Sequence, residues 1–364
     1  SAGYRTGLYT SPHLVRFTER MTVDGKEMSE ARLAKLVREM RELTGSNRFP
    51  RPLTFFEITT ALAFLYFSER GVEEAVVEVG MGGRLDATNV IRPRCCVITP
   101  ISVEHTAYLG DTLSKIAYEK ASIIKDGVPV ICSPQEPKAA RVITWMADCK
   151  GSRIKSLDRD FRYACLSQDL EGTTVRRDAL GAEVRLGMLG RYQCQNAAVA
   201  AEAALEVGKD ISITRDSIVD GLSKARWPGR LEVVRRSPLT VLDVTHTPDG
   251  AKAVASEMTI FPGNPRVMVV GMLRDKDARG AMAHLAPMFD QVICTSSTSP
   301  RALGPGEMLE AARPFNASSQ AVEGVGRAID AANAIAGQGG FLFISGSLYT
   351  IGEAMQHLEV RHGP

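Results

Sequence analysis

Glu78 is the first residue of this sequence whose type and place could do chemistry. It falls within a short, apolar, β-branched run from Glu74 to Gly80, which predicts a strand covered on both faces. An ionised carboxylate inside such a strand costs several kcal/mol of free energy unless a partner compensates for it. A metal ion would do so, and so would an ion pair with an arginine such as Arg84. This residue alone leaves both interpretations open.

A glycine-rich turn, Gly80-Met-Gly-Gly-Arg-Leu-Asp86, follows the same strand. Ligands of open α/β sheets bind at the carboxyl ends of strands, and glycines let a ligand approach the backbone closely. Arg84 and Asp86 are the side chains that such a turn would present. A tight loop without a ligand is the alternative interpretation.

His105 lies just past the end of the next predicted strand, which runs from Arg94 to Ile101. Because helices alternate with strands here, we expect a parallel sheet whose strand ends share one edge. His105 would then lie near Glu78. A histidine beside a carboxylate at that edge suits a metal ligand or a catalytic group.

Lys120 falls within the apolar stripe of a helix predicted over 111–125, with Asp111 as its N-cap. Three interpretations remain open for a lysine on this face. Its stem could extend along the helix to solvent, or its cation could face a phosphate. Alternatively, carbon dioxide could carbamylate it and turn the ammonium into an anionic metal-binding group.

Two further segments carry polar side chains that could bind ligands. Thr54-Phe-Phe-Glu57 opens a helix predicted over 54–67 and has the spacing of a capping box, which is a structural role. Ser11 lies in a turn after Tyr9, where its hydroxyl could contact a hard cation beside a nucleotide phosphate.

The remaining pattern predicts two α/β domains. A helix at 137–150, antiparallel hairpins at 164–189 and helices at 193–207 and 214–225 complete the first domain, residues 1–228. The Pro228-Gly229 step is the predicted boundary, and residues 229–364 form a second, doubly wound domain. Its expected strands lie at 240–244, 266–271, 291–295 and 340–345, with helices near 248–260, 277–288, 305–313, 322–336 and 348–358.

Composition limits the classes of protein to which this sequence can belong. A chain of 364 residues is too long for one ordinary core. No apolar run approaches the roughly 18 to 20 residues that span a membrane, so we expect a soluble protein with no membrane partner. A net charge of +2 with scattered arginines argues against nucleic acid. Seven cysteines without a CxxC pair suggest buried thiols in a reducing cytoplasm.

Taken in order, these segments resemble folylpolyglutamate synthase and dihydrofolate synthase, which are Mur-type amide ligases. The likeness runs over essentially the whole chain. It rests on motifs at Thr10–Leu14, Glu19–Arg20, Thr54–Glu57, Val77–Asn89, His105–Gly110, Glu119–Lys125, Gln193 with Asn196, Trp227–Glu232, Asp243 with His246, Gly271–Asp277 and Ser345–Tyr349.

The resemblance implies a Mur-ligase-type ATPase domain with a mainly parallel sheet, followed by a smaller Rossmann-like glutamate ligase domain. It implies ATP-dependent ligation of L-glutamate to dihydropteroate or folate through an acyl phosphate, in a cytoplasmic monomer. Mg²⁺ would be the metal cofactor, with room for a second divalent ion.

The resemblance also assigns roles to individual residues of this sequence. Ser11, Glu78 and His105 would ligate Mg²⁺, and Lys120 would be the carbamylated lysine. Asn196, Arg230 and Asp243 would hold ATP, with His246 close to the reacting carboxylate. The pterin site would be lined by Thr54, Phe55, Phe56, Glu57, Arg84, Leu85 and Asp86.

The chain departs from the family pattern at three places. The family's phosphate-binding loop, which ends in Gly-Lys-Gly-Ser, should precede Tyr4, so we expect a chain truncated at its N-terminus. Glu104 stands where the family has Asp, and Thr247 stands where it has an amide side chain. The missing loop and Thr247 motivate an alternative, an inactive pterin-binding relative. A Mur-type ligase with another acceptor is a further alternative.

Overall fold

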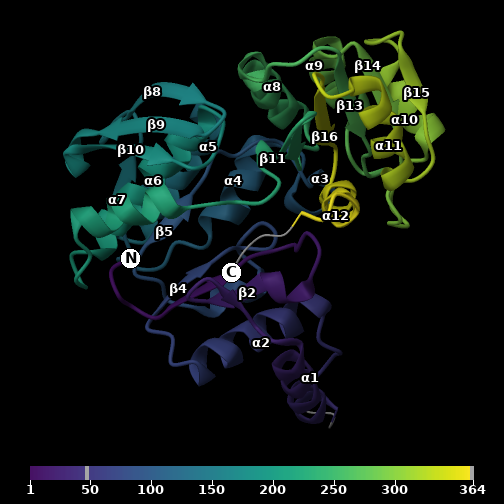
Figure 1. The fold of residues 1–364 in the computed structure, drawn as a ribbon. Coiled ribbons are helices and arrows are strands. Elements are labelled where there is room, and N and C mark those ends of the chain that lie inside the picture. Colours follow the sequence, from purple (N-terminus) through teal and green to yellow (C-terminus); the bar gives the residue numbers. More distant parts are fainter. Residues whose placement is uncertain (46–48, 361–364) are drawn as a thin grey trace.

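The computed structural model describes residues 1–45 and 49–360 (Figure 1). The chain up to Lys224 builds three small sheets, and the chain after Gly229 builds one larger sheet with its own helices. Figure 1 shows this larger unit at the upper right, beside the sheets of the first part. The predicted mixed α/β fold with parallel sheets is confirmed.

The first sheet has the strand order β3-β2-β1-β4, in which β1 and β4 run parallel. Helices α1 and α2 pack against it through a cluster that includes Tyr9, Leu36 and Leu62. The capping box at the start of α2 is present as predicted, with Thr54 as the N-cap. The elements are β1 Thr6–Tyr9, η1 Phe17–Arg20, β2 Met21–Val23, β3 Lys26–Glu27, α1 Glu30–Thr44, α2 Phe55–Glu69 and β4 Glu74–Val77.

The strand before Glu78 is shorter and more exposed than the sequence predicts. Strand β4 ends at Val77, and Ala75 and Val76 are exposed, so the prediction of a strand buried on both faces is wrong. β4 lies at the edge of its sheet and pairs with β1, whereas the next strand, β5, belongs to another sheet. A short apolar run looks the same in sequence at an edge and in the middle of a sheet.

The second sheet is parallel, with the order β5-β6-β7. Helices α4 and α5 cover it through Ile98, Ile116 and Ile143. Helix α4 is shorter than predicted, and Thr112 rather than Asp111 is its N-cap. Asp111 instead accepts a hydrogen bond from Lys115 Nζ at 2.8 Å. The elements are η2 Ala87–Val90, β5 Cys96–Ile98, α3 Thr106–Leu109, α4 Leu113–Ala121, β6 Val130–Cys132, α5 Pro137–Cys149 and β7 Ile154–Ser156.

The third sheet is the antiparallel unit that the sequence predicts after residue 164. Its strands pair in the order β10-β9-β8, and helices α6 and α7 pack against them. Its elements are β8 Ala164–Asp169, β9 Gly172–Arg177, η3 Asp178–Leu180, β10 Ala182–Leu186, α6 Tyr192–Val207 and α7 Arg215–Lys224.

The C-terminal sheet has six strands in the order β11-β12-β16-β13-β14-β15, parallel except for β11. Helices α8, α9 and α10 pack on one face, and α11 and α12 pack on the other. The predicted doubly wound pattern is confirmed, with β11 and β15 as additional strands. The elements are β11 Glu232–Arg236, β12 Leu239–Asp243, α8 Pro248–Glu257, η4 Met258–Ile260, β13 Arg266–Val270, α9 Ala278–Leu285, η5 Ala286–Met288, β14 Gln291–Cys294, α10 Pro305–Ala312, β15 Ser319–Ala321, α11 Val325–Ala336, β16 Phe341–Ser345 and α12 Leu348–His357.

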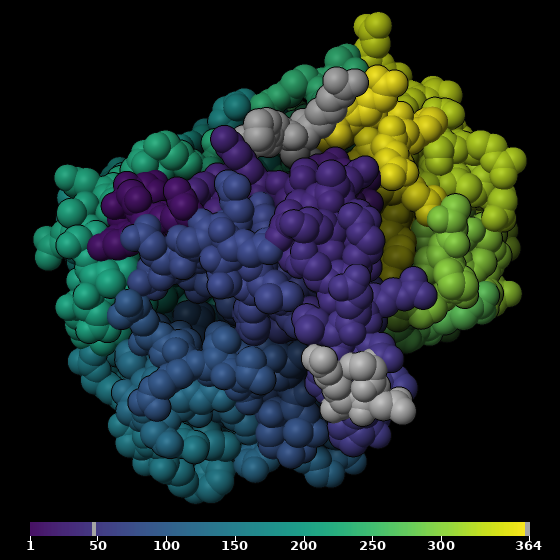
Figure 2. All heavy atoms as spheres, turned by 90° about the horizontal axis from the view of Figure 1, so that it is seen from below, coloured from purple at the N-terminus to yellow at the C-terminus, as the bar shows by residue number. Residues whose placement is uncertain are grey.

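The two parts of the chain share apolar contacts. Leu189 and Tyr192 pack into the core cluster of the C-terminal sheet. Leu14 packs against α12, where a Cβ atom at Gly352 would lie 2.2 Å from the Leu14 carbonyl oxygen. In Figure 2, purple N-terminal residues lie against yellow C-terminal ones. The loop between Tyr9 and Glu19 therefore joins the first sheet to the C-terminal unit.

The structure bears on two expectations from composition, which concern the cysteines and membrane-spanning helices. All seven cysteines are free, and four of them, Cys96, Cys132, Cys194 and Cys294, are buried. Among the helices of residues 1–45 and 49–360, none has the length and hydropathy needed to cross a bilayer.

Candidate active site

Ser11 and Glu78 meet because the parallel strands β1 and β4 end side by side. The Glu78 backbone N–H donates to the Tyr9 carbonyl at 2.9 Å, and Glu78 Oε2 accepts a hydrogen bond from the Ser11 N–H at 2.9 Å. Glu78 keeps exposed surface, yet surrounding protein atoms remove enough hydration to raise the pKa of its carboxyl group. The Ser11 N–H and the charge of Arg230 oppose this rise in pKa.

The glycines after Glu78 are required by packing within the protein. A Cβ atom at Gly80 would lie 2.3 Å from the ring of Phe56, and one at Gly83 would lie 2.7 Å from the Glu119 carbonyl oxygen. The turn therefore presses against α2 and α4, which is the structural interpretation of these glycines. Gly80 thus lies against Phe56, and the Gly83 end of the turn lies against α4.

The side chains of this turn have protein partners of their own. Arg84 Nε donates to Glu119 Oε1 at 2.9 Å, so the predicted alternative of an ion pair with Glu78 is wrong. Asp86 accepts hydrogen bonds from the N–H groups of Met81 at 2.9 Å and Thr88 at 3.0 Å, and it caps η2. Leu85, between them, is 81% exposed.

The start of α2 combines a fixed carboxylate with an exposed ring. Glu57 accepts from the Thr54 N–H at 2.7 Å and from Arg51 Nη2 at 2.6 Å. Arg51 and then Thr54 lower the pKa of Glu57 to about 2. Phe55 is 63% exposed, although Arg20 lies 5.5 Å from the centre of its ring. Phe55 and Leu85 thus leave apolar surface at the start of α2 and in the turn at 80–86.

His105 and Lys120 belong to a second group, which Glu104 joins. His105 is exposed and has a φ of +50°, in the left-handed region where a non-glycine residue signals strain often found at functional sites. Lys120 is half-buried, and its Nζ lies 3.4 Å from Glu104 Oε1. Sequence reasoning identified Glu104 only as a departure, although its place directly before His105 was the available signal.

Asp243 lies at the end of β12 and is fully buried. Its Oδ2 accepts from the Leu231 N–H at 2.9 Å, and its Oδ1 accepts from the Thr245 N–H at 2.8 Å. Burial raises the pKa of this carboxyl group, against the hydrogen bonds from Thr245 and the charge of Arg230. Because Leu231 has a φ of +47°, the bond to Asp243 holds an unusual backbone conformation directly after Arg230.

His246 follows Asp243 in the loop before α8. Its Nδ1 lies 3.0 Å from the Val244 carbonyl oxygen, which only accepts hydrogen bonds, so Nδ1 carries the proton and Nε2 stays an acceptor. Burial lowers the pKa of His246, Lys276 and Arg230 lower it further, and Glu104 opposes them. Thr247, the departure from the family pattern, is the N-cap of α8.

Asn196 lies on α6 and is exposed, with its Nδ2 donating to Gln193 Oε1 at 2.9 Å. Tyr192, at the start of the same helix, is within electrostatic reach of Asp243 and Arg230, and burial raises its pKa. The start of α6 therefore faces the carboxyl end of β12.

Arg230 connects the predicted residues of the two parts, because its charge acts on Glu78, Asp243 and His246. Glu104 likewise acts on His246 across the same space. In the described part of the chain, no hydrogen bond or ion pair links the Ser11–Glu78 pair to His105. The same ranges contain no group of three His, Cys, Asp or Glu side chains with metal-binding geometry.

Arg20 and Lys276 are further charged residues near the site that sequence reasoning did not assign. Arg20 is buried between the rings of Phe17 and Phe55, and its Nε donates to His13 Nδ1 at 2.9 Å. Arg20 and Lys276 both belong to the motifs that carry the family resemblance, but the spacing of residues around them did not distinguish them from surface cations.

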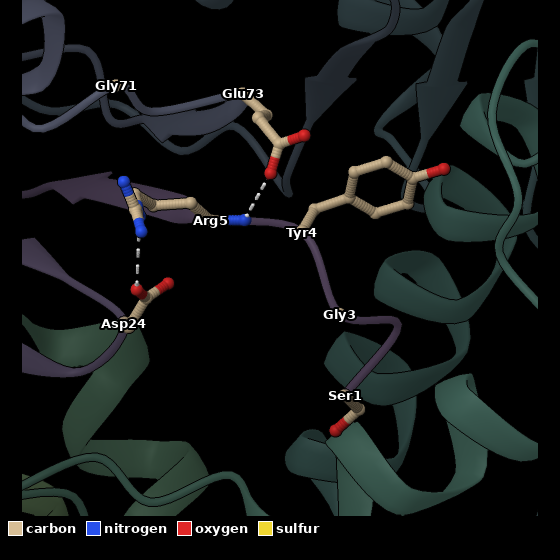
Figure 3. Close-up of a pocket in the computed structure, with 7 residues that line it drawn as sticks. All are labelled: Ser1, Gly3, Tyr4, Arg5, Asp24, Gly71 and Glu73. Carbon is tan, nitrogen blue, oxygen red and sulfur yellow. Dashed lines mark hydrogen bonds and ion pairs between the residues drawn. The ribbon is translucent and has the colours of Figure 1, made fainter.

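A cavity of about 680 Å³ lies elsewhere, at the start of β1. Figure 3 shows Arg5 between Glu73 and Asp24, with its backbone N–H donating to Glu73 Oε2 at 2.8 Å. None of the residues predicted for the active site lines this cavity; its lining is Ser1, Gly3, Tyr4, Arg5, Asp24, Gly71 and Glu73.

Comparison with known proteins decides the family. Residues 26–204 match the Mur ligase middle domain, and residues 229–348 match the Mur ligase glutamate ligase domain. The chain is 33% identical over 362 residues to the dihydrofolate synthase/folylpolyglutamate synthase of Escherichia coli, covering 99% of this chain and 82% of that protein. The chain belongs to the folylpolyglutamate synthase and dihydrofolate synthase family of Mur ligases. The predicted family and ligase class are thereby confirmed.

Other members of the folylpolyglutamate synthase family extend the likeness. A probable bifunctional folylpolyglutamate synthase/dihydropteroate synthase of Haloferax volcanii is 35% identical, and this chain spans 43% of its length. Solved structures agree in fold. Folylpolyglutamate synthase of Mycobacterium tuberculosis complexed with ADP and AMPPCP has a TM-score of 0.89 at 32% identity, over 100% of this chain and 86% of that one. E. coli FolC in complex with DHPP and ADP has a TM-score of 0.86, over 100% of this chain and 84% of that one.

Proposed function

We propose that this protein joins L-glutamate to the carboxylate of dihydropteroate or a folate while ATP is converted to ADP and phosphate. The observation that carries the proposal is that the charge of Arg230 acts on Glu78, Asp243 and His246, in a chain that belongs to this ligase family. Relatives solved with ADP, AMPPCP and DHPP support a nucleotide and a pterin as ligands.

The reaction has two steps in this proposal. A carboxylate oxygen of the pteroate or folate attacks the γ-phosphorus of ATP, the bond to the β-phosphate oxygen breaks, and ADP leaves. The glutamate amine then attacks the acyl phosphate carbon and loses a proton, and phosphate leaves. Since charge builds up on phosphate oxygens, cations such as Arg230 and Lys276 accelerate the first step by electrostatics and orientation.

Asn196, Arg230 and Asp243 hold the nucleotide in this proposal. Asp243 acts through its fixed backbone contacts, which orient Arg230 by pinning Leu231. His246 contributes a neutral imidazole whose Nε2 is an acceptor, because burial and neighbouring cations lower its pKa. That nitrogen suits contact with the glutamate ammonium near the reacting carboxylate, where it can accept the released proton.

In this proposal Ser11, Glu78 and His105 hold Mg²⁺. The Ser11 N–H orients one oxygen of Glu78, and Glu78 has no ion pair within the described ranges. Carboxylate and hydroxyl oxygens are ligands that Mg²⁺ prefers. When bound, the ion would offset negative charge on the transferring phosphate, and a second divalent ion would add to the same effect.

Lys120 is carbamylated in the active enzyme under this proposal. The ammonium first loses a proton, and the free amine then adds carbon dioxide and releases a second proton, which leaves an anionic carbamate in place of the cation. Because Glu104 Oε1 lies 3.4 Å from Lys120 Nζ, this change replaces attraction by repulsion, and Glu104 must turn away. Intact mass under mild conditions would show the added carbon dioxide, and a Lys120→Arg variant would lack it.

The pterin lies against Phe55 and Leu85, whose exposed apolar surface suits a flat ring. Thr54, Phe56 and Glu57 complete one side of the site, and Arg84 and Asp86 complete the other. Glu57 and Asp86 are already held by backbone N–H groups, so their remaining lone pairs are fixed acceptors for pterin amino groups.

We further propose a cytoplasmic monomer that acts on small molecules and binds neither nucleic acid nor membrane.

The test of the ligase reaction is ADP release by the natural full-length protein with dihydropteroate or a tetrahydrofolate, each with and without glutamate. We expect release that depends on both the pterin and glutamate. An absence of turnover with every acceptor would overturn the proposal and favour an inactive pterin-binding relative.

A further inference from the structure

Glu257 is a buried carboxylate that the proposed reaction does not use. It is the last residue of α8 and is 5% exposed. Across residues 1–45 and 49–360, its side chain accepts hydrogen bonds and forms no ion pair with a lysine, arginine or histidine. The end of a helix carries partial negative charge, which disfavours a second negative charge there. A carboxylate in this position is costly, so its contacts need an explanation.

The contacts of Glu257 cross from the C-terminal unit to the first part of the chain. Its Oε1 accepts from the Arg191 N–H at 2.9 Å, and its Oε2 accepts from Gln168 Nε2 at 3.0 Å. Arg191 is the residue directly before α6, and Gln168 lies on β8. One side chain of α8 therefore fastens both a helix start and a strand of the neighbouring unit.

The two ends of this contact lead to opposite sides of the proposed nucleotide site. Helix α8 begins at Pro248, two residues after His246, and its ten residues span about 15 Å. Helix α6 starts beside Glu257 and carries Asn196. Tyr192 of α6 is within electrostatic reach of both Glu257 and Asp243. A shift of α6 against α8 would thus change the separation of Asn196 from Asp243.

We propose that Glu257 is a positioning residue for the nucleotide: by locking the start of α6 to the end of α8, it sets the distance between Asn196 and the Arg230–Asp243 pair. The inference rests on the proposed function, because it assumes ATP at that site. It predicts a selective effect on ATP, since Glu257 contacts neither α2 nor the turn at 80–86, which carry the proposed pterin residues.

The experiment compares Glu257→Ala with Glu257→Gln in the natural full-length protein. Alanine removes both acceptors, and we expect the KM for ATP to rise about tenfold while the KM for the pterin stays unchanged. Glutamine keeps an acceptor for Arg191. The new glutamine amide can also donate a hydrogen bond to Gln168 Oε1, which is buried and has no partner in the wild-type protein. This requires the Gln168 amide group to rotate by half a turn. We therefore expect Glu257→Gln to restore the KM for ATP.

Asn316→Ala is the matched control for loss of a partly buried polar contact. Asn316 Nδ2 donates to the carbonyls of Ala286 at 3.1 Å and Phe289 at 2.7 Å, entirely within the C-terminal unit. We expect this variant to lose stability with no change in the KM for ATP. An equal rise in that KM in Asn316→Ala, or an unchanged KM in Glu257→Ala, would overturn the proposal.

Gln168→Ala provides a second test in case Glu257→Ala does not fold. It removes one of the two hydrogen bonds, so a smaller, ATP-selective rise in KM supports the proposal and an unchanged KM overturns it. Hydrogen exchange of the peptide that contains Arg191 adds a readout independent of turnover, and we expect faster exchange in Glu257→Ala. If the wild-type protein releases no ADP, the proposed function fails, whereas normal wild-type turnover with unaltered variants refutes only the role of Glu257.

Discussion

Glu78 and Asp243 are two carboxylates at strand ends that share the influence of Arg230, and the protein holds them in opposite ways. Asp243 is 1% exposed and accepts two backbone N–H groups from its own unit. Glu78 is exposed and accepts one backbone N–H, from Ser11. The strand of Asp243 is buried along its whole length, whereas the strand before Glu78 is an edge.

Asp243 is therefore a carboxylate that stabilises the fold, whereas Glu78 is one that can bind a ligand. The bonds of Asp243 fix Leu231 and therefore the backbone next to Arg230. Among the described residues, the second carboxylate oxygen of Glu78 has no hydrogen-bond or ion-pair partner, at the place where the proposed metal would bind. Substitutions should therefore affect stability at Asp243 and activity alone at Glu78.

Asp243→Ala should have the largest effect. It leaves the buried N–H groups of Leu231 and Thr245 unpaired, each at a cost of about 1–3 kcal/mol. We expect the free energy of unfolding to fall by about 3 kcal/mol in urea denaturation, and turnover to fall at least about a hundredfold. Asp243→Asn keeps one acceptor and should lose less stability. A stable Asp243→Ala protein would break the comparison.

Glu78→Gln should reduce turnover about a hundredfold while leaving the free energy of unfolding within about 1 kcal/mol of the wild type. Burial raises the pKa of Glu78, so its contribution to stability is present below the unfolded pKa and lost as pH rises through the folded pKa. A neutral glutamine avoids that loss at pH 7. The measurements are ADP release with varied Mg²⁺ and urea denaturation. A marked loss of stability would place Glu78 in the same class as Asp243.

Gly352→Ala tests whether the loop of Ser11 depends on the C-terminal unit. The new Cβ would meet the Leu14 carbonyl oxygen, so we expect the free energy of unfolding to fall by about 1–3 kcal/mol. Displacement of the Ser11 loop should also weaken Mg²⁺ binding, so that half-maximal turnover requires more Mg²⁺. Gly306→Ala is the control, because that exposed position on α10 has no atom within 4 Å of an added Cβ. It should stabilise the protein by up to about 1 kcal/mol. Equal melting temperatures of Gly352→Ala and Gly306→Ala would argue against the contact between Leu14 and α12.

His246 should show the smallest effect, a pH dependence of stability. Burial lowers its pKa, so its favourable contribution is present above the unfolded value near 6.5 and is lost as pH falls below that value. We expect the difference in unfolding free energy between wild type and His246→Gln to change by at most about 1 kcal/mol between pH 7 and 5. A His246 ring that titrates above 6.5 by NMR would contradict this prediction.

Helices and the C-terminal strands could be predicted because their signals are local. The capping box of Thr54 and Glu57 marks the start of α2, and apolar runs mark β12, β13, β14 and β16. Strands β11 and β15 gave no such signal. β15 is three residues long with the sequence Ser-Gln-Ala, and β11 contains charged residues at a sheet edge.

The site was less predictable because its contacts join distant segments. The partner of Lys120 is Glu104, sixteen positions away, and that of Arg84 is Glu119. Strands β4 and β5 belong to different sheets, which no periodicity could reveal. The roles of Ser11 and His105 were suggested by their positions at strand ends and by the family resemblance, and that of Asn196 by the resemblance alone. All three stay predictions.

The apolar contacts between the two parts constrain how such proteins can be recombined. Leu14, Leu189 and Tyr192 come from the first part of the chain, yet they contact the core clusters of the C-terminal unit. A chimera joined at Gly229 would therefore pair foreign surfaces at these three positions. Successful exchange between relatives should require transfer of the Leu14 loop and the start of α6 together with the C-terminal segment.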